Sequence, residues 1–231
     1  MEEKNKKIII LLGPPGSGKG TQGQLLSEKY GLYFFETSKL IEDIFLSNAE
    51  FLETPEGKFY IKDEKELRAA GKLCSPPFIF KLISDYVRKL HDLGTFILFS
   101  GSPRTEYEAQ RLIPLLCELY GKENITLFAL TMDPNDSIYR NSNRRICELM
   151  RHSILYNEDT KNLKTCPIDG SLLIKRDGVG DDPETIKIRL EEYEQRTKPI
   201  INYIQGQGIK TFLIDASQTP KEVFKSIIAY L

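Results

Sequence analysis

The sequence predicts an α/β fold built on a five-stranded parallel sheet. Short runs rich in apolar and β-branched residues alternate along the chain with helical patterns. This alternation requires crossover connections, which join parallel strands, and the near-continuous apolarity of the runs indicates that both faces of the sheet are buried. The expected strands are residues 8–12, 32–36, 95–99, 125–130 and 210–214.

The first expected strand leads into a glycine-rich loop, Gly-Pro-Pro-Gly-Ser-Gly-Lys-Gly-Thr, at residues 13–21. The spacing G-x-x-x-x-G-K between a strand and a helix is that of a P-loop, in which backbone N–H groups, the helix N-terminus and a lysine hold phosphates. The hydroxyl residue that usually follows the lysine is replaced by Gly20, and Thr21 comes one place later. We expect a nucleotide phosphate here; the alternative is a turn that only joins strand to helix.

Two segments interrupt the α/β pattern, which resumes after each of them. Residues 37–75 hold helix-like segments, a turn-rich piece and a charged run, and residues 140–180 are polar and rich in turn formers. The sequence therefore predicts a core formed by residues 1–36, 76–139 and 181–231, with two inserted subdomains.

The bulk composition excludes several classes of protein. The 231 residues include 32 basic and 33 acidic residues, for a net charge of −1, which argues against general binding of nucleic acid or of anionic membranes. No apolar run has the length of a signal peptide core or a membrane span, so we expect a cytoplasmic protein. The 4 cysteines are too few and too scattered for a disulfide framework, which favours reduced thiols or a metal site.

Several motifs occur in the same order as in a known family. They are the ending Gly-Lys-Gly-Thr-Gln at 18–22, Ala-Gly-Lys-Leu at 70–73, Gly-Ser-Pro-Arg-Thr at 101–105, and Arg140 followed by Arg144-Arg145. In these the chain resembles the adenylate kinase family of nucleoside monophosphate (NMP) kinases, over nearly its whole length. The resemblance implies a P-loop kinase core with an NMP-binding insertion at 37–75 and a lid at 140–180. It also implies ATP with Mg²⁺ and a monophosphate as partners, and a chain that is often monomeric.

The resemblance assigns roles to individual residues. The catalytic positive charges would be Lys19, Arg104, Arg144, Arg176 and Arg189. ATP would be bound by Gly16, Ser17, Gly18, Lys19, Gly20, Thr21 and Arg140, where Arg140 and Arg144 are expected to share a helix face. The acceptor would be bound by Thr37, Lys72, Leu73, Cys74, Gly101, Arg104 and Glu108.

The acceptor side departs from the family pattern. Glu42 falls where the family has a phosphate-binding arginine, with Lys39 and Arg68 as candidate compensating charges, and Ser100 falls where the family has an aspartate that orients Mg²⁺-bound water. Glu108 falls where a glutamine reads the acceptor base; a carboxylate only accepts hydrogen bonds, which suits guanine, unless Glu108 is simply a solvated helix residue.

The identity of the acceptor is left open by these departures. The retained Thr37 favours AMP, although taken alone this residue reads as a helix cap. The alternatives are a kinase for GMP or another monophosphate, and a nucleotide-binding protein that has lost catalysis.

The expected lid contains a candidate zinc site. Some members of the family hold zinc there, and Cys147, His152, Cys166 and Asp169 would supply a tetrahedron in this chain. Met150 stands at the simple C-x-x-C spacing, but a thioether is a poor Zn²⁺ ligand. The alternative is a metal-free lid held by side-chain hydrogen bonds.

Overall fold

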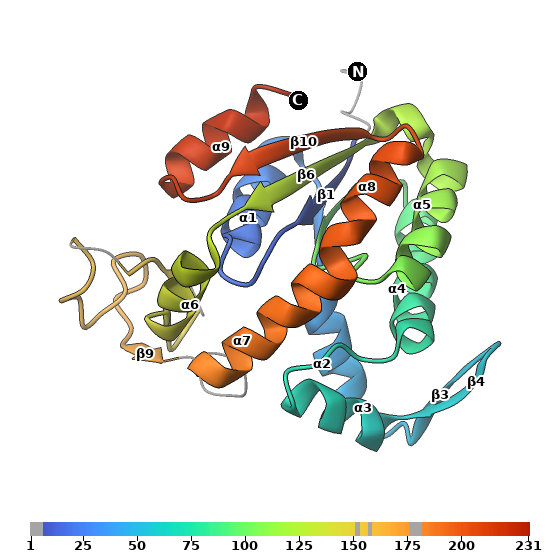
Figure 1. The fold of residues 1–231 in the computed structure, drawn as a ribbon, viewed down its shortest axis with the longest axis horizontal. Coiled ribbons are helices and arrows are strands. Elements are labelled where there is room, and N and C mark those ends of the chain that lie inside the picture. Colours follow the sequence, from blue (N-terminus) through green and yellow to red (C-terminus); the bar gives the residue numbers. More distant parts are fainter. Residues whose placement is uncertain (1–6, 151–152, 157–158, 176–181) are drawn as a thin grey trace.

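The parallel sheet is present in the computed structural model, which describes residues 7–150, 153–156, 159–175 and 182–231 (Figure 1). Its strands are β1 (Ile8–Leu12), β2 (Tyr33–Glu36), β5 (Ile97–Ser100), β6 (Ile125–Thr131) and β10 (Lys210–Asp215). They pair in the order β10-β6-β1-β5-β2, and every pairing is parallel. This confirms the predicted α/β architecture, with strand ends shifted by one or two residues.

Helices cover both faces of the sheet, as the apolar strands require. On one face, Ile8 and Ile10 of β1 pack in a cluster with buried residues of α4 (Pro76–Asp92), α5 (Glu106–Tyr120) and α8 (Lys198–Gly206). On the other face, Ile9 and Leu11 pack with residues of α1 (Lys19–Tyr30) and α9 (Pro220–Ile228). Because side chains alternate across a strand, a strand buried on both faces must be apolar throughout.

The segment 37–75 lies outside the sheet and follows the carboxyl end of β2 (Figure 1). It contains α2 (Thr37–Leu46), a hairpin of β3 (Phe51–Thr54) with β4 (Gly57–Tyr60), and α3 (Ile61–Ala69). The turn-rich piece predicted from the sequence forms the hairpin, and the charged run forms α3.

The segment after β6 begins with α6 (Pro134–Ser142) and continues into a small antiparallel sheet. Its strands are β7 (Arg145–Cys147), β8 (Ser153–Ile154) and β9 (Leu173–Lys175), paired in the order β8-β7-β9. The chain returns to the core through α7 (Pro183–Glu192), which a π-helical turn at Tyr193–Thr197 joins to α8. Both excursions therefore begin at carboxyl ends of parallel strands, where such sheets bind ligands.

None of the helices formed by the described residues combines the length and the apolar character needed to cross a membrane.

Candidate functional site

The glycine-rich loop connects β1 to α1 in a strained conformation that needs glycine. Gly16 and Gly18 have φ angles of 78° and 83°, in the left-handed region, and Gly18 is the N-cap of α1. A Cβ atom on Gly13 would lie 2.7 Å from Ser17 Oγ and 2.8 Å from the Leu130 carbonyl oxygen. Lys19, the first residue of α1, folds back over the loop, and its Nζ donates to the carbonyl oxygens of Gly13 and Pro14, each at 2.7 Å.

Helix α6 holds this loop through two buried polar residues that the sequence reasoning missed. Ser137 Oγ donates to the Pro15 carbonyl oxygen at 2.6 Å. Asn141 Nδ2 donates to the Ser137 carbonyl oxygen at 2.7 Å, and a Cβ on Gly16 would lie 2.5 Å from that Nδ2 atom. Both side chains are fully buried. Their spacing of four residues on a polar helix was the available signal, since it places both on one face.

Positive charges from three other parts of the chain act on the Lys19 amine. Burial, and next the charges of neighbouring arginines, hold the pKa of Lys19 well below its usual range. The neighbours are Arg104 in the loop after β5, Arg189 on α7, and Arg144 between α6 and β7. Like charges repel in a partly desolvated space, so this cluster favours a polyanion such as a nucleotide polyphosphate.

The lid arginines differ in part from the expectation. Helix α6 ends at Ser142, so Arg144 follows the helix instead of sharing a face with Arg140, and its guanidinium donates to Asn141 Oδ1. The reason is that α6 ends at Ser142 with Asn143 as its C-cap, so Arg144 lies beyond the helix. Arg140 donates to the carbonyl oxygens of Ala216 and Ser217, both at 2.8 Å, after β10. Arg176 lies outside the described residues.

Arg104 is positioned by its own loop and by the returning helices. Its Nε donates to the Gly101 carbonyl oxygen at 2.7 Å, and its own carbonyl oxygen accepts from Thr197 Oγ1 at 2.9 Å, in the π-helical turn. Gly101 has φ 96°, and a Cβ there would lie 2.7 Å from Arg104 Nη2. The guanidinium therefore lies against a bare backbone, at the carboxyl end of β5.

Glu108 is a buried residue of α5, so the expectation of a solvated helix residue is wrong. Its Oε2 accepts from the Arg104 backbone N–H and its Oε1 from Thr105 Oγ1, both at 2.9 Å. Thr105 is the N-cap of α5, and Glu108 is turned back toward it. Burial raises the pKa of Glu108, while these hydrogen bonds and the charge of Arg104 oppose that rise. Both carboxylate oxygens thus accept hydrogen bonds from the Arg104–Thr105 loop. Recognition of the acceptor base by Glu108 stays a prediction.

The remaining acceptor-side residues lie around the carboxyl ends of β2 and β5. Thr37 opens α2 but is not its cap, because Glu36 is the N-cap and the Thr37 hydroxyl lies 2.7 Å from Ser102 Oγ, also buried. Ser100 ends β5. Lys72 is exposed, Leu73 is half-buried, and the Cys74 thiol is buried, donating to the Glu64 carbonyl oxygen at 3.7 Å.

Arg68 is the residue that compensates the charge of Glu42. Arg68 Nη2 lies 2.8 Å from Glu42 Oε1, whereas Lys39 Nζ lies 2.5 Å from Glu36 Oε2. The expectation that Lys39 could neutralise Glu42 is therefore wrong: Lys39, at i+3 from Glu36, pairs within its own first turn.

The segment after α6 brings three of the four candidate metal ligands together. The ligand atoms of Cys147, Cys166 and Asp169 all lie within 4.8 Å of one another, and Cys147 Sγ lies 3.0 Å from Asp169 Oδ2. Both cysteines are buried, and the Ile168 N–H lies 3.4 Å from Cys166 Sγ. Two sulfurs and a carboxylate are a donor set that suits Zn²⁺. His152 lies outside the described residues.

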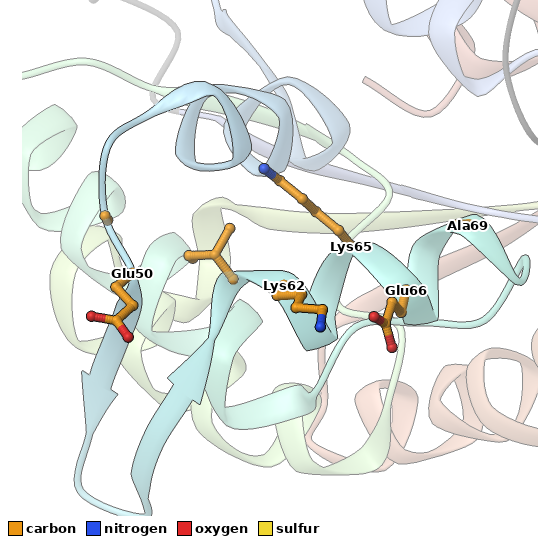
Figure 2. Close-up of a pocket in the computed structure, with 7 residues that line it drawn as sticks. Glu50, Lys62, Lys65, Glu66 and Ala69 are labelled. Carbon is orange, nitrogen blue, oxygen red and sulfur yellow. The ribbon is translucent and has the colours of Figure 1, made fainter.

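A surface pocket of about 490 Å³ lies on another part of the 37–75 segment. Figure 2 shows that α3 supplies Lys62, Lys65, Glu66 and Ala69, with Glu50 opposite them at the start of β3. Its lining contains none of the residues expected to bind nucleotide. The cluster of cations around Lys19 therefore stays the candidate site.

Comparison with known proteins agrees with the arrangement of these motifs. The adenylate kinase family model matches residues 11–209. An adenylate kinase of Borrelia duttonii is 33% identical over 221 residues, which cover 95% of this chain and 95% of that protein. An adenylate kinase of Clostridium perfringens is 33% identical over 226 residues, covering 96% and 97%. The relationship thus extends over the core and both excursions, and the chain belongs to the adenylate kinase family.

Proposed function

We propose that this protein transfers the γ-phosphoryl group of Mg·ATP to AMP, forming two molecules of ADP. A phosphate oxygen of AMP attacks the γ-phosphorus in line, and ADP leaves from the other side. The observation that carries the proposal is that Arg104, Arg144 and Arg189, from separate elements, all act electrostatically on Lys19 of the P-loop. Family membership, and relatives that bear the name adenylate kinase, support the same activity.

The positive cluster accounts for catalysis without a covalent or general-base residue. In phosphoryl transfer the charge spreads over the transferring oxygens, and positioned cations stabilise it most in a site that excludes water. Lys19 would bind the β- and γ-phosphates of ATP from the P-loop. Arg104 would contact the acceptor monophosphate, since it lies at the carboxyl end of β5. Ser17 and Thr21, an exposed hydroxyl on α1, are the hydroxyl residues of the loop that would support Mg²⁺, which would enter with ATP and screen the phosphate charges.

The two excursions would close over the substrates. Residues 37–75 would cover the monophosphate and residues 140–180 would cover ATP, with Arg176 acting from the second segment. The hydrogen bond from Ser137 to the Pro15 carbonyl oxygen joins α6, the helix that leads into the second segment, to the P-loop.

A zinc ion bound by Cys147, Cys166, Asp169 and His152 would pin the lid strands. A small antiparallel sheet of short strands buries little apolar surface, and here the buried cluster consists of Cys147, Ile154 and Cys166 with Leu173 against it. Structural zinc contributes folding free energy outright, which such a segment needs. The metal would have no part in the chemical step.

The cytoplasmic location and the monomeric state expected from the sequence stay predictions.

The test is ADP formation from ATP with each of AMP, GMP, CMP and UMP. We expect AMP to be the best acceptor and Lys19→Met to lose at least about a hundredfold in kcat, as for loss of a charge that stabilises the transition state. Lys29→Met on the exposed side of the same helix is the matched control and should keep wild-type activity. Faster turnover with GMP would overturn the choice of AMP. ATP binding without any monophosphate-dependent ADP would overturn the enzymatic proposal.

A further inference from the structure

Two guanidinium groups from different segments interact electrostatically at the acceptor side of the site. Arg68 lies in the last turn of α3, and Arg104 lies in the loop after β5. Burial lowers the pKa of Arg104; Glu108 opposes that shift, and Arg68 adds to it. Burial raises the pKa of the Cys74 thiol to about 12, and Arg68 and Arg104 both oppose that rise. The two cations thus share one environment, around the buried thiol of Cys74.

The hydrogen bonding of the two arginines leaves donors available. A guanidinium carries five N–H donors. Among the residues that the structure describes, Arg68 bonds to Glu42 Oε1 through Nη2, and the Arg104 side chain bonds to the Gly101 carbonyl oxygen through Nε. About a third of the Arg68 side chain is exposed, 32%, so it is neither buried as a structural ion nor fully solvated.

We propose that Arg68 is a binding residue for the phosphate of the acceptor monophosphate, which it holds together with Arg104 while Glu42 orients it. The inference rests on the proposed function and names a residue of its acceptor site. Glu42 offsets the charge of Arg68 only in part, because Arg68 still lowers the pKa of Arg104; a phosphate dianion bound by both guanidinium groups would offset this repulsion through charge-assisted hydrogen bonds. Lys39 is not a comparable candidate, since it is paired with Glu36 and its side chain is 72% exposed.

Glu42 has a definite part in this arrangement. Its carboxylate is joined to one nitrogen of Arg68 and spans from α2 to α3, which fixes the direction of the guanidinium plane. Its side chain is half exposed, at 52%. Glu42 therefore positions Arg68 through one guanidinium nitrogen and leaves other N–H groups available for a phosphate.

The test compares AMP with adenosine, which lacks the phosphate. In Arg68→Gln we expect the Kd for AMP to rise about 10- to 100-fold, the effect of losing a charged hydrogen-bond partner, while the inhibition constant of adenosine stays within about twofold. Arg88→Gln, an exposed arginine on α4, is the matched control and should leave both constants unchanged. Equal weakening of AMP and adenosine, or an unchanged AMP affinity, would overturn the proposal.

Glu42→Gln separates phosphate binding from an ion pair that only joins α2 to α3. It removes the charge of the ion pair but keeps the guanidinium and an amide oxygen that can still accept from Arg68 and orient it, so we expect AMP affinity to stay within about threefold of wild type. If Glu42→Gln weakens AMP binding as much as Arg68→Gln does, Arg68 acts only through the pair and the proposal is wrong. Thermal unfolding of both variants, together with their ATP affinity, verifies that each is folded.

Failure of this inference can be told apart from failure of the proposed function. If the wild type forms ADP from ATP and AMP but Arg68→Gln binds AMP normally, only the assignment of Arg68 is wrong. If the wild type neither binds AMP nor forms ADP, the proposed function fails, and the assignment of Arg68 fails with it.

Discussion

Replacing the P-loop glycines with alanine one at a time measures how strongly the loop conformation depends on glycine. Gly18 has φ 83°, and a Cβ atom added there would meet none of the described atoms within 4 Å, so Gly18→Ala adds only the cost of a left-handed backbone, about 1–2 kcal/mol. Gly20 lies in α1 with open space around it, so Gly20→Ala should stabilise by about 0.5 kcal/mol through a better helix propensity.

Gly16→Ala should be the most destabilising of the three. It has the same left-handed conformation, with φ 78°, and its Cβ would lie 2.5 Å from Asn141 Nδ2. Asn141 is fully buried, and moving it breaks the 2.7 Å bond to the Ser137 carbonyl oxygen, which adds about 1–2 kcal/mol. The expected total, with the backbone cost included, is therefore about 2–4 kcal/mol.

Urea unfolding without nucleotide gives these free energies, and each kcal/mol corresponds to about 2–4 °C in Tm for a chain of this size. A loss below about 0.5 kcal/mol in Gly18→Ala would refute the left-handed N-cap. A Gly16→Ala loss no larger than that of Gly18→Ala would refute the contact with Asn141. In an Asn141→Ala background, the cost of Gly16→Ala should fall to that of Gly18→Ala, which a double-mutant cycle measures.

Two further predictions concern Glu108 and the lid. Burial raises the pKa of Glu108, so the folded chain holds this proton more tightly than the unfolded chain; its stability contribution is present below the unfolded pKa, about 4.3, and is lost as the pH rises through the folded value. The unfolding free energy of wild type relative to Glu108→Gln should therefore fall as the pH rises above about 4 in urea titrations, and a rise instead would contradict the burial argument. For the lid, we expect about one zinc per chain by elemental analysis, lost in Cys147→Ser and kept in the control Cys117→Ser; less than about half an equivalent in the wild type would count against zinc.

The fold was predictable because its signals are local. Each strand of the sheet is a short apolar run, and its burial on both faces follows from that composition alone, as β1 illustrates with five consecutive buried side chains. The P-loop motif was likewise predictable from its spacing, since glycine permits the left-handed backbone that the structure shows at Gly16 and Gly18. The charged run 62–68 became α3, although the sequence left its helical character open.

The site was predictable only as a set of residue types. Glu108 was expected either to face a nucleotide base or to face solvent, but it turns inward to Arg104 and Thr105, because a backbone donor and a hydroxyl donor at the start of α5 outcompete both. Arg144 was expected to lie on a helix, but α6 ends at Ser142. Helix ends are hard to predict from sequence because they depend on local capping at one or two residues.

The sequence by itself determined the parallel sheet and the glycine-rich loop between strand and helix, because these depend on periodicity and backbone freedom within short stretches; the arginines were candidates from the family resemblance. Only the tertiary structure decided that Asn141 and Ser137 brace the loop, that Arg68 and not Lys39 pairs with Glu42, and that Arg104, Arg144 and Arg189 meet at Lys19. These partners come from elements far apart in the chain. Their pairing depends on how those elements pack, which no local pattern specifies.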